Sequence, residues 1–294
     1  MQKLQIEQDL SARLALVFIV RYSLAMKSTV TILFLGDVVG KPGRRVLTKY
    51  LTSPQRPPAD MVVVNVENSA HGFGVTEQNI KEFQDVGVNV MTGGNHTFDR
   101  KELFSFIDNY DFLLRPGNYP EGTAGHGLCY WSIGDKKVAV INLIGRVFME
   151  PLRSPFLIAD ELIAQASQET NLIFVDFHAE ATAEKVAMGL YLDGRVSAMV
   201  GTHTHVQTAD ETVLPKGTAY ITDVGCCAPI NSVIGMDSVA VYRRLVEQLP
   251  ARFEVAAGPA AASGVTITLD GETGKALEIK RLRFVETDVA DDEK

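Results

Sequence analysis

The 294-residue sequence has few cysteines and a deficit of positive charge, and each shortage excludes a class of protein. Cys129, Cys226 and Cys227 are odd in number and form no C-x-x-C spacing, so neither a disulfide framework nor a zinc ribbon is indicated. With 28 Lys and Arg against 36 Asp and Glu, the formal net charge of −8 argues against an extended nucleic-acid surface. We therefore expect a protein of the reducing cytoplasm that acts on a small partner.

Several signatures of catalysis and membrane insertion are missing as well. The sequence has no G-x-S-x-G nucleophile elbow and no G-x-G-x-x-G after its first apolar run, and GKPGR at 40–44 lacks the spacing of a nucleotide P-loop. The apolar run LALVFIV at 14–20 is too short to span a bilayer. These absences argue against a serine hydrolase, a dinucleotide cofactor and a membrane protein.

The N-terminal residues 1–25 allow more than one interpretation. As a signal peptide they are poor, because Glu7 and Asp9 stand where a basic segment is required, although SLA at 23–25 keeps that alternative open. We favour Met26 as the true start, with residues 1–25 as a poorly ordered extension. At the other end, residues 287–294 have the composition of a solvated acidic tail, so one domain is expected over 28–286.

From residue 29 onward, short apolar runs alternate with helical stretches. Near-continuous apolar runs of this kind predict strands that are buried on both faces. Helices are predicted at 76–86, where Thr76 can cap, and at 99–110, where Asp99 and Glu102 resemble a capping box. This alternation indicates the α/β class. The predicted strands are 29–37, 61–68, 88–96, 136–146, 171–180, 196–205 and 218–225.

The C-terminal part of the domain departs from this alternation. The segments 265–270 and 275–285 flank the turn GETG and predict a β-hairpin, which would add antiparallel strands at the end of the domain. We find no internal repeat or low-complexity linker in the sequence.

Side chains that can bind metal follow five of the apolar runs, each at or just past the carboxyl end. In α/β sheets this edge is where binding sites are built. Singly, each residue has an ordinary explanation: Asp37 can cap a helix, and His178 can be a hydrogen-bonded core histidine. His203 and His205 would point the same way if their backbone were extended. The placement is shared by Asp37, Glu67, Asn68, Asn95, His96, His178, His203 and His205.

The remaining candidates lack that placement. His71 in AHGFG and His126 in AGHGL do not follow a predicted strand, so we interpret both as loop residues. The adjacent Cys226 and Cys227 are interpreted as two small residues in a loop, with an accessory thiol near the site as the alternative.

Carboxylate, amide and imidazole ligands without thiolate suit iron, manganese or zinc better than calcium or magnesium. The set is larger than one tetrahedral ion requires, so two ions that share a bridging carboxylate are the simplest arrangement. Two such ions can clamp a phosphate and lower the pKa of a shared water so that hydroxide exists near neutrality. The sequence thus predicts two divalent or mixed-valence transition metal ions, which would supply the positive charge that a small anionic substrate needs.

Four features resemble, in the same order along the chain, the motifs of the calcineurin-like metallophosphoesterases. They are GD (36–37), GNH (94–96), the strand-end His178 and GTHTH (201–205). Longer segments are similar to one branch, the YmdB-like bacterial phosphodiesterases, over nearly all of 29–286. They include LFLGDVVGKPGR, NVENSAHGFGVT, TGGNHTFD, LRPGNYPEGT, FVDFHAEATAEK and DGRVSAMVGTHTHVQTADE. The resemblance implies a four-layer α/β/β/α sandwich with a dinuclear site at the strand ends.

The resemblance also implies a role for each candidate residue. Asp37, Asn68 and His205 would hold one ion, Asn95, His178 and His203 the other, and Glu67 would bridge them. His96 would approach the phosphate and protonate the departing oxygen, a role that suits an imidazole. Two differences from the broad superfamily stand out: D-V-V at 37–39 stands where D-x-H is usual, and Glu67-Asn68 stands where an Asp is usual. The resemblance therefore implies that Asn68 substitutes for the missing imidazole. Two positions differ from the YmdB-like branch itself: His71 stands where a small residue is usual, and Cys226-Cys227 stand where Met-Thr is common. These differences concern the fit of the substrate and not the metal site.

The implied activity is hydrolysis of a small phosphodiester by in-line attack of a metal-bridging hydroxide. The substrate would be a nucleoside 2′,3′-cyclic monophosphate and the product a 3′-phosphate. Two alternatives remain open: a phosphomonoesterase or nucleotidase on the same scaffold, and a metal-containing regulatory binding protein of RNA metabolism. A homo-oligomer is compatible with such a fold, but no pattern in the sequence predicts one.

Overall fold

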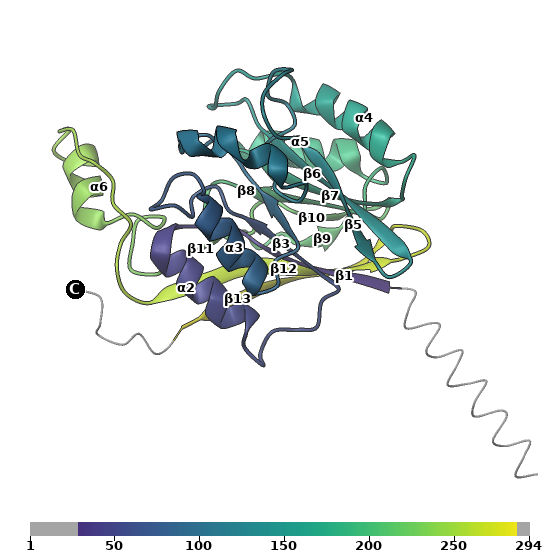
Figure 1. The fold of residues 1–294 in the computed structure, drawn as a ribbon, viewed down its shortest axis with the longest axis horizontal. Helices are drawn as coiled ribbons and strands as arrows, with labels where there is room; N and C mark the ends of the chain where they lie inside the picture. Colours follow the sequence, from purple (N-terminus) through teal and green to yellow (C-terminus); the bar gives the residue numbers. More distant parts are fainter. Residues whose placement is uncertain (1–28, 287–294) are drawn as a thin grey trace, which may run out of the picture.

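The computed structural model describes residues 29–286. The predicted extension at 1–25 and the predicted acidic tail at 287–294 lie outside the described residues. Two sheets and the helices that cover them form the described part (Figure 1), so the mixed α/β class is confirmed. No helix within 29–286 is both long and apolar enough to cross a membrane.

The first sheet has seven strands in the order β2-β11-β12-β1-β3-β4, and β13 pairs with β12. β1 lies at its centre, parallel to β3 and antiparallel to β12. The predicted C-terminal hairpin is confirmed as β12 and β13, although β12 starts earlier than expected. The strands are β1 (Thr29–Leu35), β2 (Asp37–Val38), β3 (Met61–Asn65), β4 (Val90–Thr92), β11 (Cys226–Pro229), β12 (Ala260–Asp270) and β13 (Ala276–Val285).

The second sheet has six strands in the order β5-β6-β7-β8-β10-β9. β6, β7, β8 and β10 run parallel, so their carboxyl ends reach one edge of the sheet. The strands are β5 (Leu128–Ile133), β6 (Lys136–Ile144), β7 (Leu172–His178), β8 (Ala198–Thr202), β9 (Thr212–Val213) and β10 (Ala219–Ile221).

Five α-helices and two short 3-10 helices accompany the sheets within the described residues. Figure 1 shows α6 projecting to one side, away from both sheets. The α-helices are α2 (Gly40–Leu51), α3 (Glu77–Asp85), α4 (Pro155–Ala166), α5 (Thr182–Leu192) and α6 (Ser238–Leu245), and the 3-10 helices are η1 (Lys101–Ser105) and η2 (Ile107–Asn109).

One of the two predicted helices is correct and the other is wrong. At 76–86 the structure has α3, and the Thr76 side chain caps it by accepting a hydrogen bond from the Asn79 backbone at 3.2 Å. At 99–110 the chain instead forms η1 and η2, and η1 starts after Arg100. The Asp99 carboxylate cannot serve as the expected cap because it pairs with Nδ1 of His96 at 2.8 Å.

Three apolar clusters hold these layers together. One lies between the sheets and joins Phe34 of β1 to Phe174 of β7, whose ring centroids are 5.3 Å apart. A second packs β1 and β3 against α2 and α3, and a third packs β6 and β7 against α4 and α5. Because fully buried apolar strands continue to the sheet edge, the polar residues after them are held on rigid supports.

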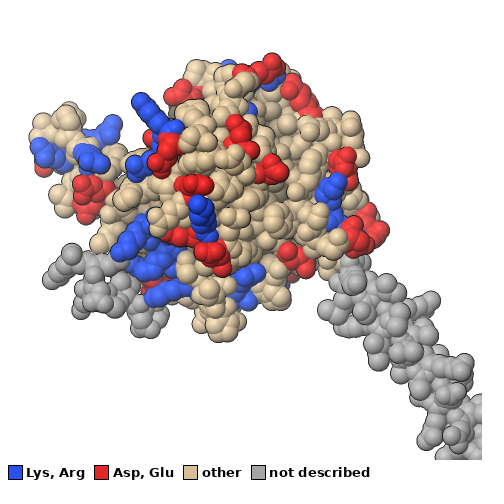
Figure 2. All heavy atoms as spheres, viewed as in Figure 1, with Lys and Arg blue, Asp and Glu red and all other residues tan. Residues whose placement is uncertain are grey.

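On the face drawn in Figure 2, Lys and Arg side chains gather at the lower left, and elsewhere they are interspersed with Asp and Glu and separated by wide uncharged areas.

Candidate metal centre

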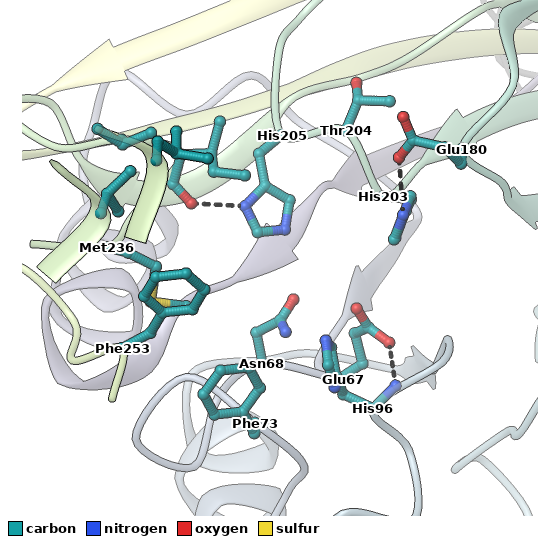
Figure 3. Close-up of a pocket in the computed structure, with 14 residues that line it drawn as sticks. Glu67, Asn68, Phe73, His96, Glu180, His203, Thr204, His205, Met236 and Phe253 are labelled. Carbon is teal, nitrogen blue, oxygen red and sulfur yellow. Dashed lines mark hydrogen bonds and ion pairs between the residues drawn. The ribbon is translucent and has the colours of Figure 1, made fainter. Parts of the chain in front are cut away.

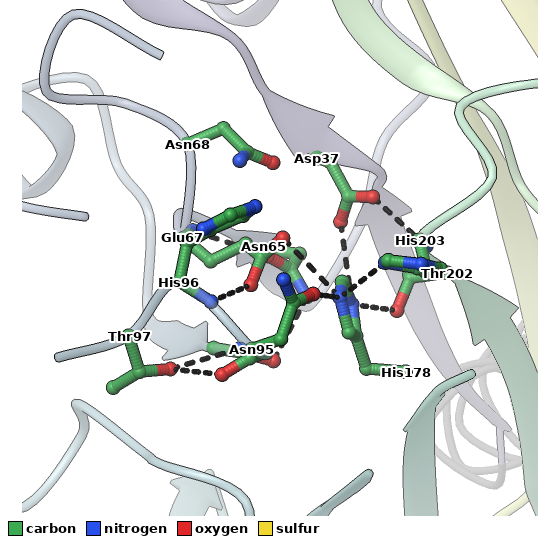
Figure 4. A network of polar contacts seen from close by, with 12 residues as sticks. Asp37, Asn65, Glu67, Asn68, Asn95, His96, Thr97, His178, Thr202 and His203 are labelled. Atoms are coloured by element: carbon green, nitrogen blue, oxygen red, sulfur yellow. Dashed lines mark hydrogen bonds and ion pairs between the residues drawn. The ribbon is translucent and has the colours of Figure 1, made fainter. Parts of the chain in front are cut away.

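All seven predicted ligands come together where the edges of the two sheets meet. Figure 4 labels six of them, and His205 is labelled in Figure 3. Asp37 starts β2 directly after β1, and His178 is the last residue of β7. The remaining five lie in the loops that follow β3, β4 and β8: Glu67, Asn68, Asn95, His203 and His205.

His178 is at the centre of one group. Its ring is fully buried, and Nε2 lies 2.9 Å from Oδ1 of Asn95, 3.0 Å from Nδ1 of His203 and 3.2 Å from Oε1 of Glu67. Ligand atoms of Glu67, His178 and His203 all lie within 4.8 Å of one another, a spacing that can hold a metal ion. This group draws on both sheets, because Glu67 and Asn95 follow strands of the first sheet.

A second group consists of Asp37, Asn68 and His205. Nε2 of His205 lies 3.4 Å from Oδ2 of Asp37. Oδ1 of Asp37 and Oδ1 of Asn68 are buried and accept no hydrogen bond from the described residues. An unsatisfied buried oxygen is costly, and two of them among these ligands fit a site that a cation completes.

Hydrogen bonds on the far side of each ligand orient it toward the centre. Nδ2 of Asn68 donates to the Gly72 carbonyl at 3.0 Å, which leaves the amide oxygen facing the site. Nδ1 of His205 contacts the Ile234 carbonyl at 2.8 Å, so this nitrogen carries the proton and Nε2 keeps its lone pair. Such outer partners fix the tautomer of metal-binding histidines.

The same reasoning applies to the other two imidazoles. The Thr202 hydroxyl donates to Asp176 at 2.8 Å and therefore accepts from Nδ1 of His178 at 3.0 Å. Nε2 of His203 lies 3.0 Å from a carboxylate oxygen of Glu180, so Nδ1 is the nitrogen left for an ion. Each histidine thus turns one ring nitrogen toward the centre, opposite the nitrogen held by its outer partner.

The electrostatics of the buried groups agree with a cation site. Burial alone would raise the pKa of Glu67, but the neighbouring His178 lowers it to about 2. Burial alone would lower the pKa of His178, but Glu67 and Asp37 raise it to about 9. Burial and the charge of His178 lower the pKa of His203 to about 3. The ionised Glu67 therefore attracts positive charge into the centre, whereas burial raises the pKa of Asp37 well above its usual value. Metal binding would displace the protons that Asp37 and His178 hold without it.

The loop that carries His203 and His205 differs from the prediction. β8 ends at Thr202, and both histidines have positive φ angles, 100° and 65°, so they do not alternate along an extended strand. The backbone N–H of His203 donates to Asp37 at 2.9 Å, and that of Thr204 donates to Asp223 at 3.1 Å. Turn geometry, not strand periodicity, brings the two rings together.

Sequence reasoning missed the residues that support the ligands. Asp176, fully buried, accepts hydrogen bonds from the side chains of Thr92, Asn65 and Thr202. Lys185 and Asp223 form a buried ion pair at 2.6 Å beneath the histidine loop. Of these residues, only Asp176 could have been predicted from the sequence. It precedes His178 by two residues in an apolar run, so both side chains lie on the same face of the strand.

His96 lies beside the ligands and keeps part of its surface in a cavity. Its backbone N–H donates to Oε2 of Glu67 at 2.9 Å, and its side chain is 29% exposed. Its ring contacts that of Phe73 edge-on, with centroids 4.8 Å apart. The cavity of about 530 Å³ is drawn in Figure 3, and its described lining includes neither His71 nor His126.

The cysteine pair lies in strand β11, and not in a loop as the sequence suggested. β11 runs parallel to β2, with Cys226 opposite Asp37, so the pair borders the strand that starts with a proposed ligand. Sγ of Cys226 contacts the His205 carbonyl at 3.4 Å, and burial raises the pKa of both thiols, that of Cys227 to about 12.

The chain matches known proteins over most of its length. The model of the family described as YmdB-like protein covers residues 33–282. A protein of Bacillus subtilis (strain 168) named 2′,3′-cyclic-nucleotide 2′-phosphodiesterase is 52% identical over 254 residues, which cover 85% of this chain and 96% of the relative.

Two solved structures are also similar. A structure described as a novel phosphatase, from Mycoplasma pneumoniae, is 37% identical with a TM-score of 0.83 and covers 87% of this chain and 94% of its own. A hypothetical protein from Thermus thermophilus is 36% identical with a TM-score of 0.82, over 87% of this chain and 99% of its own. The resemblance seen in the sequence is thereby confirmed, and the chain belongs to the YmdB-like protein family.

Proposed function

We propose that this protein is a metal-dependent phosphodiesterase that hydrolyses nucleoside 2′,3′-cyclic monophosphates to 3′-phosphates. The observation that carries the proposal is the cluster of Glu67, His178 and His203, together with two buried acceptor oxygens, on Asp37 and Asn68, that lack a partner among the described residues. The activity named for the Bacillus subtilis relative, which is similar over 85% of this chain, supports the substrate class.

Two ions are proposed, each with its own ligands. Asp37, Asn68 and His205 would hold one ion, Asn95, His178 and His203 the other, and Glu67 would bridge them. The contacts of Glu67 with His178 and of His205 with Asp37 support this division. Nitrogen and oxygen ligands without thiolate suit iron or manganese first, and zinc as well.

When bound, such ions supply positive charge that stabilises the phosphoryl transition state and lowers the pKa of water, so that hydroxide is available to attack near neutral pH. The protein itself places a proton donor beside them. The Asp99 carboxylate, 2.8 Å from Nδ1 of His96, orients the ring. His96 is therefore proposed as the general acid that protonates the departing ribose oxygen.

The layer order is part of the same proposal. We assign the fold to the four-layer α/β/β/α sandwich of the calcineurin-like metallophosphoesterases. The three apolar clusters, one between the sheets and one under each pair of helices, support this assignment. The domain is proposed to span 28–286.

Elemental analysis of anaerobically purified protein, followed by rate measurements, tests the proposal. We expect about two transition metal ions per chain and faster hydrolysis of 2′,3′-cyclic AMP than of 3′,5′-cyclic AMP or a phosphate monoester. The second candidate is a phosphomonoesterase, which the description of the Mycoplasma pneumoniae structure favours. A monoester rate above the diester rate would select that candidate instead.

The third candidate, a metal-containing binding protein, is separated by Glu67→Gln. A binder would keep its partner after this change, whereas an enzyme would lose hydrolysis together with its cellular effect. Because Glu67 is buried against His178, correct folding of the variant must be checked by its melting temperature.

A further inference from the structure

The cavity beside the candidate metal centre has an apolar half that the chemistry at phosphorus does not use. Figure 3 shows Phe253 and Met236 on one side of His205 and Asn68, and Glu180 and His203 on the other. The apolar half is lined by Phe73, Val233, Ile234, Met236, Leu245 and Phe253.

We propose that this apolar half is the subsite for the nucleobase of the substrate, and that it binds the base by stacking without selecting among the four bases. The inference rests on the proposed function, because it takes the phosphate to lie at the metal centre of the same cavity. A volume of about 530 Å³ is within the range of small-molecule sites. Aromatic side chains are the surfaces on which bases stack in proteins.

The two aromatic side chains are held in place from outside the cavity. The guanidinium carbon of Arg244 lies 5.1 Å from the centroid of the Phe253 ring, and Arg244 is not part of the lining. Around Phe73, the backbone turns at Gly72 and Gly74, both with positive φ. Arg100 then donates to the Phe73 carbonyl at 3.2 Å and so fixes this turn.

Phe73 also links the base subsite to the proton donor. Its ring contacts His96 edge-on, and His96 in turn contacts Glu67 through its backbone. A base that stacks on Phe73 would therefore bring the ribose oxygens close to His96. Phe253, which has no contact of this kind with His96 among the described interactions, is the better position for a test of base binding alone.

The lack of base selectivity follows from the chemistry of the lining. Strong discrimination between similar ligands requires side chains that hydrogen-bond to the differing groups. Valine, isoleucine, methionine, leucine and phenylalanine side chains form no such bonds. Within the described residues, the apolar half is lined by side chains of these types alone, so stacking area distinguishes purines from pyrimidines only weakly.

The test compares a substrate that has a base with one that lacks it. Phe253→Ala should raise KM for 2′,3′-cyclic AMP by about 10- to 100-fold, leave kcat nearly unchanged, and leave the hydrolysis of glycerol 1,2-cyclic phosphate unaffected. Tyr242→Ala is the matched control, because Tyr242 is 57% exposed on α6 and outside the lining. An equal loss on both substrates, or no loss on either, overturns the base subsite.

Two further measurements complete the test. For the wild-type protein we expect KM values for the 2′,3′-cyclic phosphates of adenosine, guanosine, cytidine and uridine within about 10-fold of one another, and a larger spread overturns the lack of selectivity. If the wild type hydrolyses neither diester, the proposed function fails. The base subsite is then judged by calorimetric binding of adenosine 3′-monophosphate, which Phe253→Ala should weaken and Tyr242→Ala should not; equal binding by both variants overturns it.

Discussion

At the scale of single residues, His96 differs from the other histidines of the site. Its side chain lines the cavity and pairs with Asp99, and its hydrogen bond to Glu67 comes from the backbone N–H and not from the ring. We predict that His96→Ala keeps its metal content and loses turnover of 2′,3′-cyclic AMP by about 10²- to 10⁴-fold, the usual effect of a lost general acid. Elemental analysis and steady-state kinetics measure the two quantities.

His126→Ala is the control for this prediction, because His126 contacts the Asp111 carbonyl at 2.9 Å and lies outside the cavity lining. Its kinetics should stay near those of the wild type. Activity of the His96 variant close to the wild-type value would remove this side chain from the mechanism, and loss of metal would make it a structural residue.

Gly94 is a residue whose lack of a side chain matters for the ligands. A Cβ at this position would lie 2.3 Å from Oε2 of Glu67 and 2.4 Å from Nε2 of His178. We predict that Gly94→Ala displaces one of these ligands and lowers the metal content below that of the wild type. Gly134→Ala is the control: its φ of 61° strains the new side chain locally, but nothing lies within 4 Å of the added Cβ, so its metal content should stay that of the wild type. Full metal loading of the Gly94 variant would contradict this prediction.

At the scale of elements, the loop after β8 depends on a buried charge pair. Lys185 of α5 reaches Asp223 at 2.6 Å, and Asp223 also accepts from the backbone and hydroxyl of Thr204. Both ionic side chains are at most 1% exposed. Since Thr204 stands between His203 and His205, the pair holds the backbone that carries two proposed ligands.

Removal of one partner leaves the other charge buried, which typically costs about 3–5 kcal/mol. We therefore predict that Lys185→Met lowers the free energy of unfolding by about this amount and weakens metal binding. Denaturant unfolding and metal titration measure the two effects. Lys137→Met, which breaks an exposed pair with Glu169, should change stability by less than about 1 kcal/mol. An unchanged metal affinity in Lys185→Met would exclude this positioning role.

The elements also show what the sequence can predict here and what it cannot. The carboxyl ends of the strands were predictable, because the apolar runs are local and Asp37 and His178 stand directly at their ends. The histidine loop was not, since its φ angles depend on Asp37 and Asp223, which are distant in sequence. The failed helix at 99–110 has the same cause, because the carboxylate of Asp99 has a tertiary partner in place of a capping role.

At the scale of the whole molecule, the candidate centre exists only when the two sheets are packed together. Asp37 and Glu67 lie in or just after strands of the first sheet, and His178 and His203 in or just after strands of the second. Residues such as Phe34 and Phe174 between the sheets therefore determine whether the ligands meet. Thr92 and Asp176, which hydrogen-bond across this boundary, are 84 residues apart in the sequence. No local pattern in the sequence predicts such a pairing.

The end of the described domain is held by a second buried charge, that of Glu286. Its side chain is fully buried and accepts hydrogen bonds from Arg45 of α2 and from the Ala260 backbone at 2.9 Å. Burial alone would raise the pKa of Glu286, but these donors outweigh burial and lower the pKa below its usual value of 4.5. The ionised carboxylate thus joins the end of β13 to α2 and to β12.

This arrangement predicts a pH dependence of stability with a definite sign. A carboxyl whose pKa is lower in the folded state stabilises the protein at pH values above its unfolded pKa, and this contribution is lost as pH falls through the folded value. At pH 7, Glu286→Gln should therefore lower the free energy of unfolding by about 1–3 kcal/mol. The difference from the wild type should shrink as pH falls below 4.5. Glu278→Gln, whose carboxylate is 52% exposed on β13, is the control. A difference for Glu286→Gln that stays constant between pH 7 and pH 3 would mean that the carboxylate charge does not hold this end of the domain.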